Sequence, residues 1–427
     1  MFMEFREFFD ALEKKGMITR IKKEVGTKYE ISTIMKKLDG KPLLFENVKG
    51  FDIPVIANIC STRELVAVGL GIKEDEIIKK LSGAIENPKE PEVVKAEEYE
   101  EREVDLSKFP ILTYYPFDGG PYIASGIVIA NDKELGLNAS YQRAMITGKD
   151  KFVMRILERD FHTFLERGDN EFAFCIGNSI PVMLAAAIST KTGNSELNIA
   201  NSLGETKLVE LGGHKVPQAE IIMIAAMEGE EADEGPFLDL TETPDIVRKQ
   251  KVARVKKIFV RKDPVFHALL PGGLEHKVLM GMPREPTIFK EVSKVCDVKD
   301  VLVTPGGCSW LHGAVSIRKK NPDDGKKAIE AAFQGHKSMK HVFVVDEDID
   351  IHDPNEIEWA FATRFQGDKD MVIKPREKGS SLDPSSNLET RETCKIGFDL
   401  TIPAGKDPKD FKKPKLPMEL KVEDYLE

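Results

Sequence analysis

The chain has 427 residues, a length that is sufficient for two or three domains, each with its own core. A hydrophobic content of 41% and a charged content of 31% are typical of a globular protein, and the net charge of −10 argues against general nucleic-acid binding. The five cysteines are scattered and no two form a CxxC pair, which indicates reduced thiols in a cytosol. No apolar run reaches the roughly 18 residues that a membrane-spanning helix needs. We therefore expect a cytoplasmic protein that does not enter a membrane.

Residues 1–105 predict a small α/β domain that ends in a charged linker. The opening segment, "MFMEFREFFDALEKKG", places its apolar side chains from Phe5 to Leu12 on one helical stripe, and Gly16 suits the C-terminal cap. Strand and helix patterns then alternate. The stretch 87–105, "NPKEPEVVKAEEYEEREVD", is punctuated by proline and rich in charge, which is typical of a domain boundary.

Residues 106–290 predict a β-rich domain, because short strand patterns follow one another at the spacing of a barrel or split barrel. Within it, "LNASYQRAMI" and "KFVMRIL" predict a hairpin joined by a loop at 147–150. In that register Gln142 lies opposite Arg155, and Asn138 shares their face. Arg143 then points to the other side of the sheet. The two guanidinium groups would thus serve two different pockets.

Residues 291–427 return to α/β alternation and predict a third domain. "KHVFVVDEDID" is a predicted strand, and "DPNEIEWAFATRF" is a predicted helix with Asp353 as its N-cap. Two segments here could bind ligands. However, "TPGGCSW" lacks a nucleotide-binding fingerprint, and the acidic "VVDEDIDIHD" lacks the glycine and the terminal glutamate of an EF-hand. We interpret both as structural.

The stretch "DEGPFLD", residues 233–239, is the first candidate for chemistry. Glu234 and Asp239 stand five positions apart, so a regular strand would point them to opposite faces. The Gly-Pro step between them breaks that regularity, and a turn there could bring both carboxylates into one cavity. The alternative is an ordinary solvated acidic loop.

Five further polar residues are candidates that the local pattern leaves open. Asn138, Arg143 and Arg155 lie on strands that we predict to be buried, where arginine is unusual unless it is paired. A solvated strand face would also explain them. His162, in "RDFHTFLERG", and Glu196, in "GNSELNIANSLGE", lie on predicted helices, where capping or surface roles are ordinary.

Taken together, these segments resemble the UbiD-like decarboxylases, which use prenylated FMN. The resemblance is carried by "NASYQRAMITGKDKFVMR", by "SELNIANSLGE" and by the carboxylate loop "EGEEADEGPFLD". "LLPGGLEHKVLMG", "VDEDIDIHDPNEIEWAFATRF" and "SSLDPSS" also resemble family segments, so the similarity covers essentially the whole chain. It implies a central split β-barrel that binds the flavin in residues 106–290. It also implies that the α/β region 291–427 mediates self-association.

The resemblance also implies roles for individual residues. Arg143, Glu234 and Asp239 match the family's catalytic arginine and acids. A divalent cation, Mn²⁺ or Mg²⁺ and possibly with K⁺, would be held by Asn138 and Glu196, with His162 as a less secure third ligand, and would bridge to the flavin phosphate. The residues that match cofactor-binding positions are Asn138, Ser140, Tyr141, Gln142, Arg143, Arg155 and Lys395.

The implied reaction is the non-oxidative decarboxylation of an α,β-unsaturated acid, in which the flavin accepts electrons and Glu234 returns a proton. The sequence looks most like the archaeal branch of the family, which implies trans-anhydromevalonate 5-phosphate as the substrate and isopentenyl phosphate as the product, in a modified mevalonate pathway. A flavin prenyltransferase would supply the cofactor. Three alternatives stay open: a 4-hydroxybenzoate-type aromatic acid decarboxylase, an FMN-binding flavin reductase-like protein, and a catalytically silent scaffold.

Overall fold

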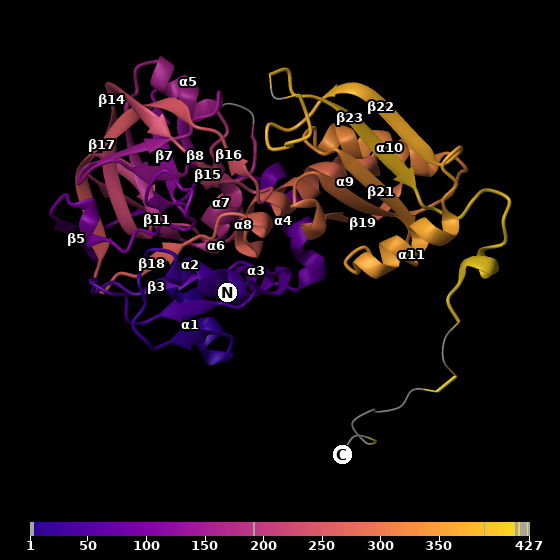
Figure 1. Ribbon diagram of the computed structural model, residues 1–427, viewed down its shortest axis with the longest axis horizontal. Coiled ribbons are helices and arrows are strands. Elements are labelled where there is room, and N and C mark those ends of the chain that lie inside the picture. Colours follow the sequence, from indigo (N-terminus) through magenta and orange to yellow (C-terminus); the bar gives the residue numbers. More distant parts are fainter. Residues whose placement is uncertain (1–3, 191–192, 388, 415–416, 419–424, 426–427) are drawn as a thin grey trace.

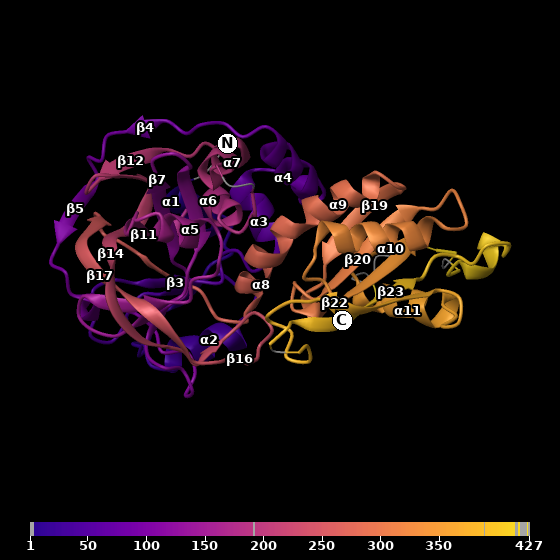
Figure 2. The same ribbon diagram turned by 90° about the horizontal axis from the view of Figure 1, so that it is seen from above.

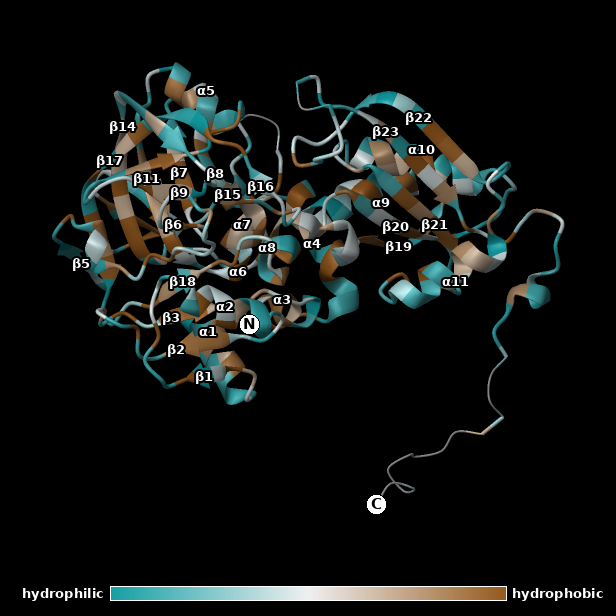
Figure 3. Cartoon of the chain, viewed as in Figure 1, coloured by the Kyte–Doolittle hydropathy of each residue, from teal (hydrophilic) through white to brown (hydrophobic). Residues whose placement is uncertain are grey.

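The computed structural model describes residues 4–190, 193–387, 389–414, 417–418 and 425. The chain forms two lobes (Figure 1). The larger lobe holds the N-terminal and central regions, and the smaller lobe holds the C-terminal sheet, with helix α8 (Leu274–Gly281) between them. Seen from above, the same two lobes lie side by side, and α8 is near the place where they meet (Figure 2). Apolar residues run along the strands of both lobes, and polar residues lie on the loops and on the outer faces of the helices (Figure 3).

The N-terminal region builds a four-stranded sheet, in the order β1-β2-β3-β18, with helices packed beside it. Its last strand comes from far along the sequence, since Phe266 pairs in parallel with Val55. The first helix buries Phe5, Phe8 and Leu12, so the predicted amphipathic helix is confirmed. The elements are β1 (Thr19–Ile21), β2 (Leu43–Phe45), β3 (Val55–Ala57), β18 (Phe266–Ala268), α1 (Phe5–Lys14), α2 (Glu30–Lys37), α3 (Arg63–Leu70) and α4 (Ile77–Glu86).

The central region builds a nine-stranded sheet around a core of phenylalanines. The strands follow the order β6-β9-β10-β17-β14-β11-β7-β8, and β5 pairs with β17. Among the described residues this path stays open, because the strands at its two ends, β6 and β8, do not pair with each other. The sheet is therefore not a closed barrel. Its strands are β5 (Tyr99–Arg102), β6 (Tyr122–Ile123), β7 (Ile127–Asp132), β8 (Gly136–Tyr141), β9 (Ala144–Ile146), β10 (Lys151–Met154), β11 (Glu171–Asn178), β14 (Ala219–Glu234) and β17 (Arg248–Arg261).

Short elements complete this lobe. One small sheet has the order β13-β12-β4, and another pairs β15 with β16. The elements are β4 (Val93–Val94), β12 (Leu208–Leu211), β13 (His214–Pro217), β15 (Phe237–Leu238), β16 (Pro244–Asp245), α5 (Asp160–Glu166), α6 (Ile180–Ala185) and α7 (Glu196–Leu203).

The predicted hairpin exists, but its register differs by one residue from our expectation. β9 and β10 pair Ile146 with Phe152 and Ala144 with Met154. Continued outward, this register sets Arg143 opposite Arg155, whereas we expected Gln142 there. A shift of one residue moves side chains to the other face of a strand. The prediction that the two arginines serve different pockets is therefore wrong.

The C-terminal region is a five-stranded mixed sheet in the order β19-β20-β21-β23-β22. The helix that begins at Asp353 is confirmed, because the Asp353 side chain accepts the N–H of Asn355 at 2.9 Å. The elements are α9 (Glu285–Ser293), α10 (Asp324–Gly335), α11 (Pro354–Arg364), β19 (Asp297–Val303), β20 (His312–Arg318), β21 (His341–Asp346), β22 (Met371–Lys378) and β23 (Glu392–Asp399). In the part of the chain that the structure describes, no helix is long and apolar enough to cross a membrane. The α/β fold class is as the sequence indicated.

Candidate active site

Arg143 lies at the centre of a cluster of carboxylates in the larger lobe. Its Nε and Nη2 donate to the two oxygens of Glu234 at 2.8 and 2.9 Å, which is a bidentate pair. Its Nη1 donates to Asp239 Oδ2 at 2.9 Å. The Glu234 side chain is fully buried, and that of Arg143 is 10% exposed. The structure thus brings together the three residues that the sequence singled out for catalysis.

The turn after β14 sets this geometry. Glu234 is the last residue of β14, and Gly235 has a φ of +106°, which an L side chain rarely adopts. The chain then enters β15, and Asp239 follows directly. The ring of Phe237 lies under the guanidinium of Arg143, with Cζ 4.8 Å from the ring centroid. One turn therefore supplies two carboxylates and the aromatic ring that packs against Arg143.

Tyr122 is a further member of the site that the sequence did not indicate. Its hydroxyl donates to Glu234 Oε1 at 3.2 Å in a buried setting. Burial, and next the charge of Glu234, raise the pKa of Tyr122 well above its usual value, so the phenol remains protonated. Glu234 Oε1 therefore receives hydrogen bonds from both Tyr122 and Arg143.

Arg155 joins the same cluster through an acid that the sequence did not reveal. Asp245 Oδ2 accepts from Arg155 at 2.6 Å and from Arg143 at 2.9 Å, and Asp245 Oδ1 accepts from Arg248 at 2.8 Å. Arg155 also reaches Asp239 Oδ2 at 3.3 Å. The cluster thus contains as many guanidinium groups as carboxylates. Burial alone would raise the pKa of Asp245, but these arginines hold it below its usual range.

His276, at the start of α8, lies within electrostatic reach of this cluster. Burial, together with the charge of Arg143, lowers its pKa, and Asp239 opposes the shift. Its Nδ1 accepts the backbone N–H of Gly272 at 3.1 Å. The proton of the neutral ring therefore resides on Nε2. His276 stands in "LLPGGLEHKVLMG", a segment to which we gave no residue role.

Asn138, on β8, and Glu196, at the start of α7, also meet as expected. Glu196 Oε2 accepts from Asn138 Nδ2 at 3.0 Å and from the N–H of Ala139 at 2.9 Å. Thr190 donates to Glu196 Oε1 at 3.0 Å. Burial raises the pKa of Glu196 to about 7. Asn138 Oδ1 is buried without a hydrogen-bond partner among the described atoms.

One residue of the expected metal set, His162, and one of the expected cofactor set, Lys395, lie elsewhere. His162, on α5, pairs with Glu166 at 3.5 Å, and its side chain is 35% exposed. Within the described ranges, no three His, Cys, Asp or Glu side chains form a group that could hold a metal. Lys395, on β23, donates to the backbone carbonyl of Lys337, and its Nζ lies 5.5 Å from the ring centroid of Phe333. The Nζ of Lys395 therefore contacts the C-terminal lobe.

The remaining predicted cofactor residues line the end of β8. The hydroxyl of Ser140 accepts from Gln142 Nε2 at 3.4 Å, and the N–H of Gln142 donates to the carbonyl of Gly126 at 3.0 Å. The hydroxyl of Tyr141 is buried and has no hydrogen-bond partner in the described part of the chain. An unpaired buried hydroxyl is costly, so this end of β8 suits a polar ligand.

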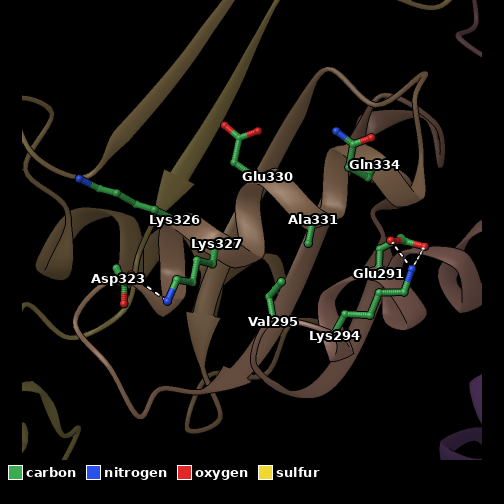
Figure 4. Close-up of a pocket in the computed structure, with 9 residues that line it drawn as sticks. All are labelled: Glu291, Lys294, Val295, Asp323, Lys326, Lys327, Glu330, Ala331 and Gln334. Atoms are coloured by element: carbon green, nitrogen blue, oxygen red, sulfur yellow. Dashed lines mark hydrogen bonds and ion pairs between the residues drawn. The ribbon is translucent and has the colours of Figure 1, made fainter.

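A separate open depression of about 500 Å³ lies between α9 and α10, in the smaller lobe (Figure 4). Its walls carry two local ion pairs, Lys294 with Glu291 at 2.6 Å and Lys327 with Asp323 at 2.8 Å. It contains none of the candidate residues. We assign the chemistry to the Arg143 cluster, because buried and paired ionisable groups converge there.

The chain matches three consecutive family models. Residues 9–85 match the N-terminal domain of 3-octaprenyl-4-hydroxybenzoate carboxy-lyase, residues 86–274 match its Rift-related domain, and residues 277–400 match its C-terminal domain. The chain belongs to the UbiD family. The family is one of decarboxylases, and this chain is accordingly a UbiD-family enzyme.

Two curated relatives of this UbiD-family chain come from archaea. The anhydromevalonate phosphate decarboxylase of Methanothermobacter thermautotrophicus is 42% identical, over 93% of this chain and 96% of the relative. That of Methanocaldococcus jannaschii is 43% identical, over 91% of this chain and 95% of the relative.

Solved UbiD-class structures share the whole fold. The enzyme HmfF from Pelotomaculum thermopropionicum, in complex with FMN, superposes with a TM-score of 0.95 at 35% identity and covers 99% of this chain and 100% of HmfF. An evolved dimeric form of HmfF, in complex with prFMN, has a TM-score of 0.90 at 34% identity, over 99% of this chain and 100% of that form. The 3,4-dihydroxybenzoic acid decarboxylase of Klebsiella pneumoniae, at 22% identity, matches in fold alone.

Proposed function

We propose that this enzyme decarboxylates trans-anhydromevalonate 5-phosphate to isopentenyl phosphate without net oxidation. The bond between C1 and C2 breaks, CO2 leaves, and C2 gains a proton. Two archaeal relatives at 42% and 43% identity carry the corresponding name, which supports this substrate. The observation that carries the proposal is the bidentate pair between Arg143 and the fully buried Glu234, with Asp239 on the same guanidinium.

The cofactor that we propose is prenylated FMN, which supplies an electron sink for the carbon that loses CO2. HmfF, at 35% identity, was solved with FMN, which supports a flavin in this fold. The donor set fits a divalent cation beside the flavin phosphate, because Asn138 Oδ1 is buried without a partner and Glu196 offers a buried carboxylate next to it. Both are oxygen donors, which Mg²⁺ and Mn²⁺ prefer. Asn138 and Glu196 would hold the metal, and His162 is not arranged with them.

The protein's own residues position the substrate carboxylate and deliver the proton. Arg143 orients Glu234 through two hydrogen bonds, and its charge attracts the carboxylate of the substrate. Glu234, whose side chain is fully buried, would first take up a proton in exchange for one of its hydrogen bonds, and it would give that proton to C2 after CO2 has left. Asp239 binds the same guanidinium, so Arg143 couples the two carboxylates.

Three further proposals follow from the family. A flavin prenyltransferase matures the cofactor. The chain self-associates through residues 291–427, and it resides in the cytoplasm. The domain limits 1–105, 106–290 and 291–427 stay predictions.

The experiment that tests the proposed function begins with enzyme co-produced with a flavin prenyltransferase. An absorbance spectrum and the mass of the extracted cofactor identify the flavin, and CO2 release from trans-anhydromevalonate 5-phosphate measures the reaction. Prenylated FMN together with turnover supports the proposal. Prenylated FMN without turnover overturns the substrate, and plain FMN or no flavin overturns the chemistry.

A further inference from the structure

Arg284 is a partly buried arginine that has no acidic partner among the described residues. It ends the 3-10 turn Met282–Arg284, directly after α8, and precedes α9. Nearly every other arginine of this acidic chain forms an ion pair. Those without a carboxylate within 4.0 Å in the described ranges are Arg159, Arg284, Arg376 and Arg391, and all except Arg284 are exposed.

Hydrogen bonds hold the guanidinium of Arg284 in place, but they do not use all of its donors. Its Nη1 donates to Ser189 Oγ at 3.0 Å, and its Nη2 donates to the carbonyl of Ala187 at 2.8 Å. Its Nε is buried without a hydrogen-bond partner in the described structure. Because a guanidinium carries five N–H donors, most of its capacity remains available. The ring of Trp310 supports it, with Cζ 5.2 Å from the ring centroid.

The surroundings of Arg284 are positively charged. Burial, and next the charge of Arg159, lower the pKa of Arg284 to about 10. Arg284 and Lys395 also act together on His336, whose pKa is lowered to about 3, first by burial. An arginine that is desolvated and faces further cations costs free energy unless an anion joins it. The residues at this place therefore favour an anionic ligand with several acceptor oxygens.

The location of Arg284 suits the far end of the proposed substrate. Ser189 and Ala187 come from the larger lobe and Trp310 from the smaller, so Arg284 lies where the lobes meet. His276, eight residues earlier on α8, is close enough to Arg143 and Asp239 for their charges to act on it. With a rise of about 1.5 Å per residue in α8 and about 2.0 Å per residue in the 3-10 turn that follows, Arg284 lies roughly 13 Å along the axis from His276. The helix thus leads from the catalytic cluster to an unpaired cation.

We propose that Arg284, with Arg159 beside it, binds the phosphate monoester of the substrate at the junction of the two lobes. A phosphate offers the several acceptor oxygens that a planar guanidinium can engage. The inference rests on the proposed function and adds to it the group that recognises the phosphorylated end. Arg284 is a binding residue in this account, and the chemistry remains with Arg143, Glu234 and Asp239.

The test compares the holoenzyme with its Arg284→Gln variant on two substrates, trans-anhydromevalonate 5-phosphate and trans-anhydromevalonate without the phosphate. We expect the substitution to lower kcat/KM for the phosphorylated acid about 100-fold, mainly through KM, because hydrogen bonds to a charged group are lost. For the unphosphorylated acid we expect kcat/KM to change less than about threefold, because this acid has no phosphate for Arg284 to bind. Arg284→Lys should recover part of the loss, and Arg376→Gln, which removes an exposed and unpaired arginine, should change neither value.

Two measurements on the same proteins do not depend on turnover. Calorimetric titration of the holoenzyme with isopentenyl phosphate should show binding to the wild type and at least tenfold weaker binding to Arg284→Gln. The amount of flavin bound per chain should stay equal in both. Equal losses on the two substrates would overturn the inference, and so would a loss of flavin, since the anion at Arg284 would then be the cofactor phosphate. If the wild type binds isopentenyl phosphate through Arg284 but releases no CO2, the proposed function fails while the phosphate site stands.

Discussion

At the scale of single residues, the chemistry of the site depends on the hydrogen bonds that orient Glu234. Its two oxygens accept from Arg143 and one also accepts from Tyr122, and no water reaches the side chain from outside. Arg143 keeps the carboxylate oriented, while the phenol of Tyr122 stays protonated and donates. Glu234 is the acceptor in all of these hydrogen bonds, so it must exchange one of them for a proton before it can protonate a ligand.

We therefore expect Glu234→Gln to remain folded, at some cost in stability because Arg143 loses a buried charged partner, and to lose decarboxylation. The amide has the shape of the carboxyl group but cannot transfer a proton to carbon, and the loss of a general acid typically lowers kcat by about 100- to 10,000-fold. Turnover assays, thermal unfolding and flavin content per chain measure the three parts of this expectation. Activity within tenfold of the wild type would remove Glu234 from its role.

Asp245 provides a second prediction at the same scale. Its folded pKa is held low by arginines, so its contribution to stability is present above its unfolded pKa of about 4 and is lost as the pH falls through the folded pKa. Asp245→Asn leaves three guanidinium groups with two carboxylates in a buried cluster. We expect a loss of about 3 kcal/mol in the free energy of unfolding at pH 7, since breaking a buried pair leaves an uncompensated charge.

Urea unfolding at pH 7 and at pH 3.5 tests this expectation, because the difference from the wild type should shrink at the lower pH. Asp233→Asn is the matched control, since Asp233 pairs with Lys249 on the surface with both side chains at least 60% exposed. We expect less than about 1 kcal/mol from that pair. A loss for Asp245→Asn that does not depend on pH would contradict the electrostatic explanation.

At the scale of elements, the hairpin explains what the sequence could and could not predict. The order of residues was sufficient to place Arg143 and Arg155 on adjacent strands, because a glycine-containing loop follows a strand pattern. It did not determine the register, since Thr147 bonds to Lys151 and so shifts the pairing by one residue. Register in a hairpin depends on the turn that closes it, and a one-residue shift decides which face an arginine occupies.

Asp245 and His276 were missed for a related reason. Asp245 reaches the cluster because the two-residue strand β16 pairs with β15, with Asp245 opposite Phe237. A pairing this short has no detectable periodicity in the sequence. His276 is brought near Asp239 by packing between α8 and the turn after β15, which is a contact between distant segments. The resemblance to a family supplied the catalytic residues, and only the folded chain supplied their partners.

The turn after Glu234 depends on a close approach between two glycines, which gives a third prediction. A Cβ added to Gly119 would lie 2.2 Å from the carbonyl oxygen of Gly235, and the N–H of Gly119 donates to the carbonyl of Pro236 at 3.0 Å. Gly119→Ala must therefore displace the segment that positions Glu234 and Asp239. We expect kcat to fall at least tenfold, because misplacement by about 1 Å can cost roughly 100-fold in rate.

Gly148→Ala is the matched control for this prediction. Gly148 lies in the hairpin loop, and an added Cβ would come no closer than 3.6 Å to its nearest neighbour. The kcat of Gly148→Ala should stay within about twofold of the wild type, because the substitution moves no part of the site. Equal activities of the two variants would show that the approach of Gly119 to Gly235 does not position the acids.

At the scale of the whole molecule, one buried acid joins regions that are far apart in the sequence. Glu285 begins α9 and accepts from Arg63 of the N-terminal region at 2.7 and 2.9 Å. It also accepts the N–H of Val303, from the C-terminal sheet, at 3.3 Å. The side chains of Arg63 and Glu285 are 17% and 2% exposed. The pair therefore fixes the small lobe against the large one, next to Arg284, where we place the phosphate.

We expect Arg63→Gln to weaken this junction in a manner that depends on pH. Burial already raises the pKa of Glu285, and the charge of Arg63 opposes that shift, so removal of Arg63 raises the pKa further. A carboxyl group whose folded pKa is raised contributes its stability below the unfolded value of about 4.3 and loses it as the pH rises through the folded pKa. The variant should consequently lose about 3 kcal/mol at pH 8, since Glu285 must then stay buried and charged without its partner. The loss should become smaller toward pH 5, where Glu285 can take up a proton.

Urea unfolding at both pH values measures the difference. Arg318→Gln is the control, because it breaks the exposed pair with Glu347, for which we expect a loss of less than about 1 kcal/mol. A loss that is larger at pH 5 than at pH 8 would reverse the sign and show that Arg63 does not act through the charge of Glu285.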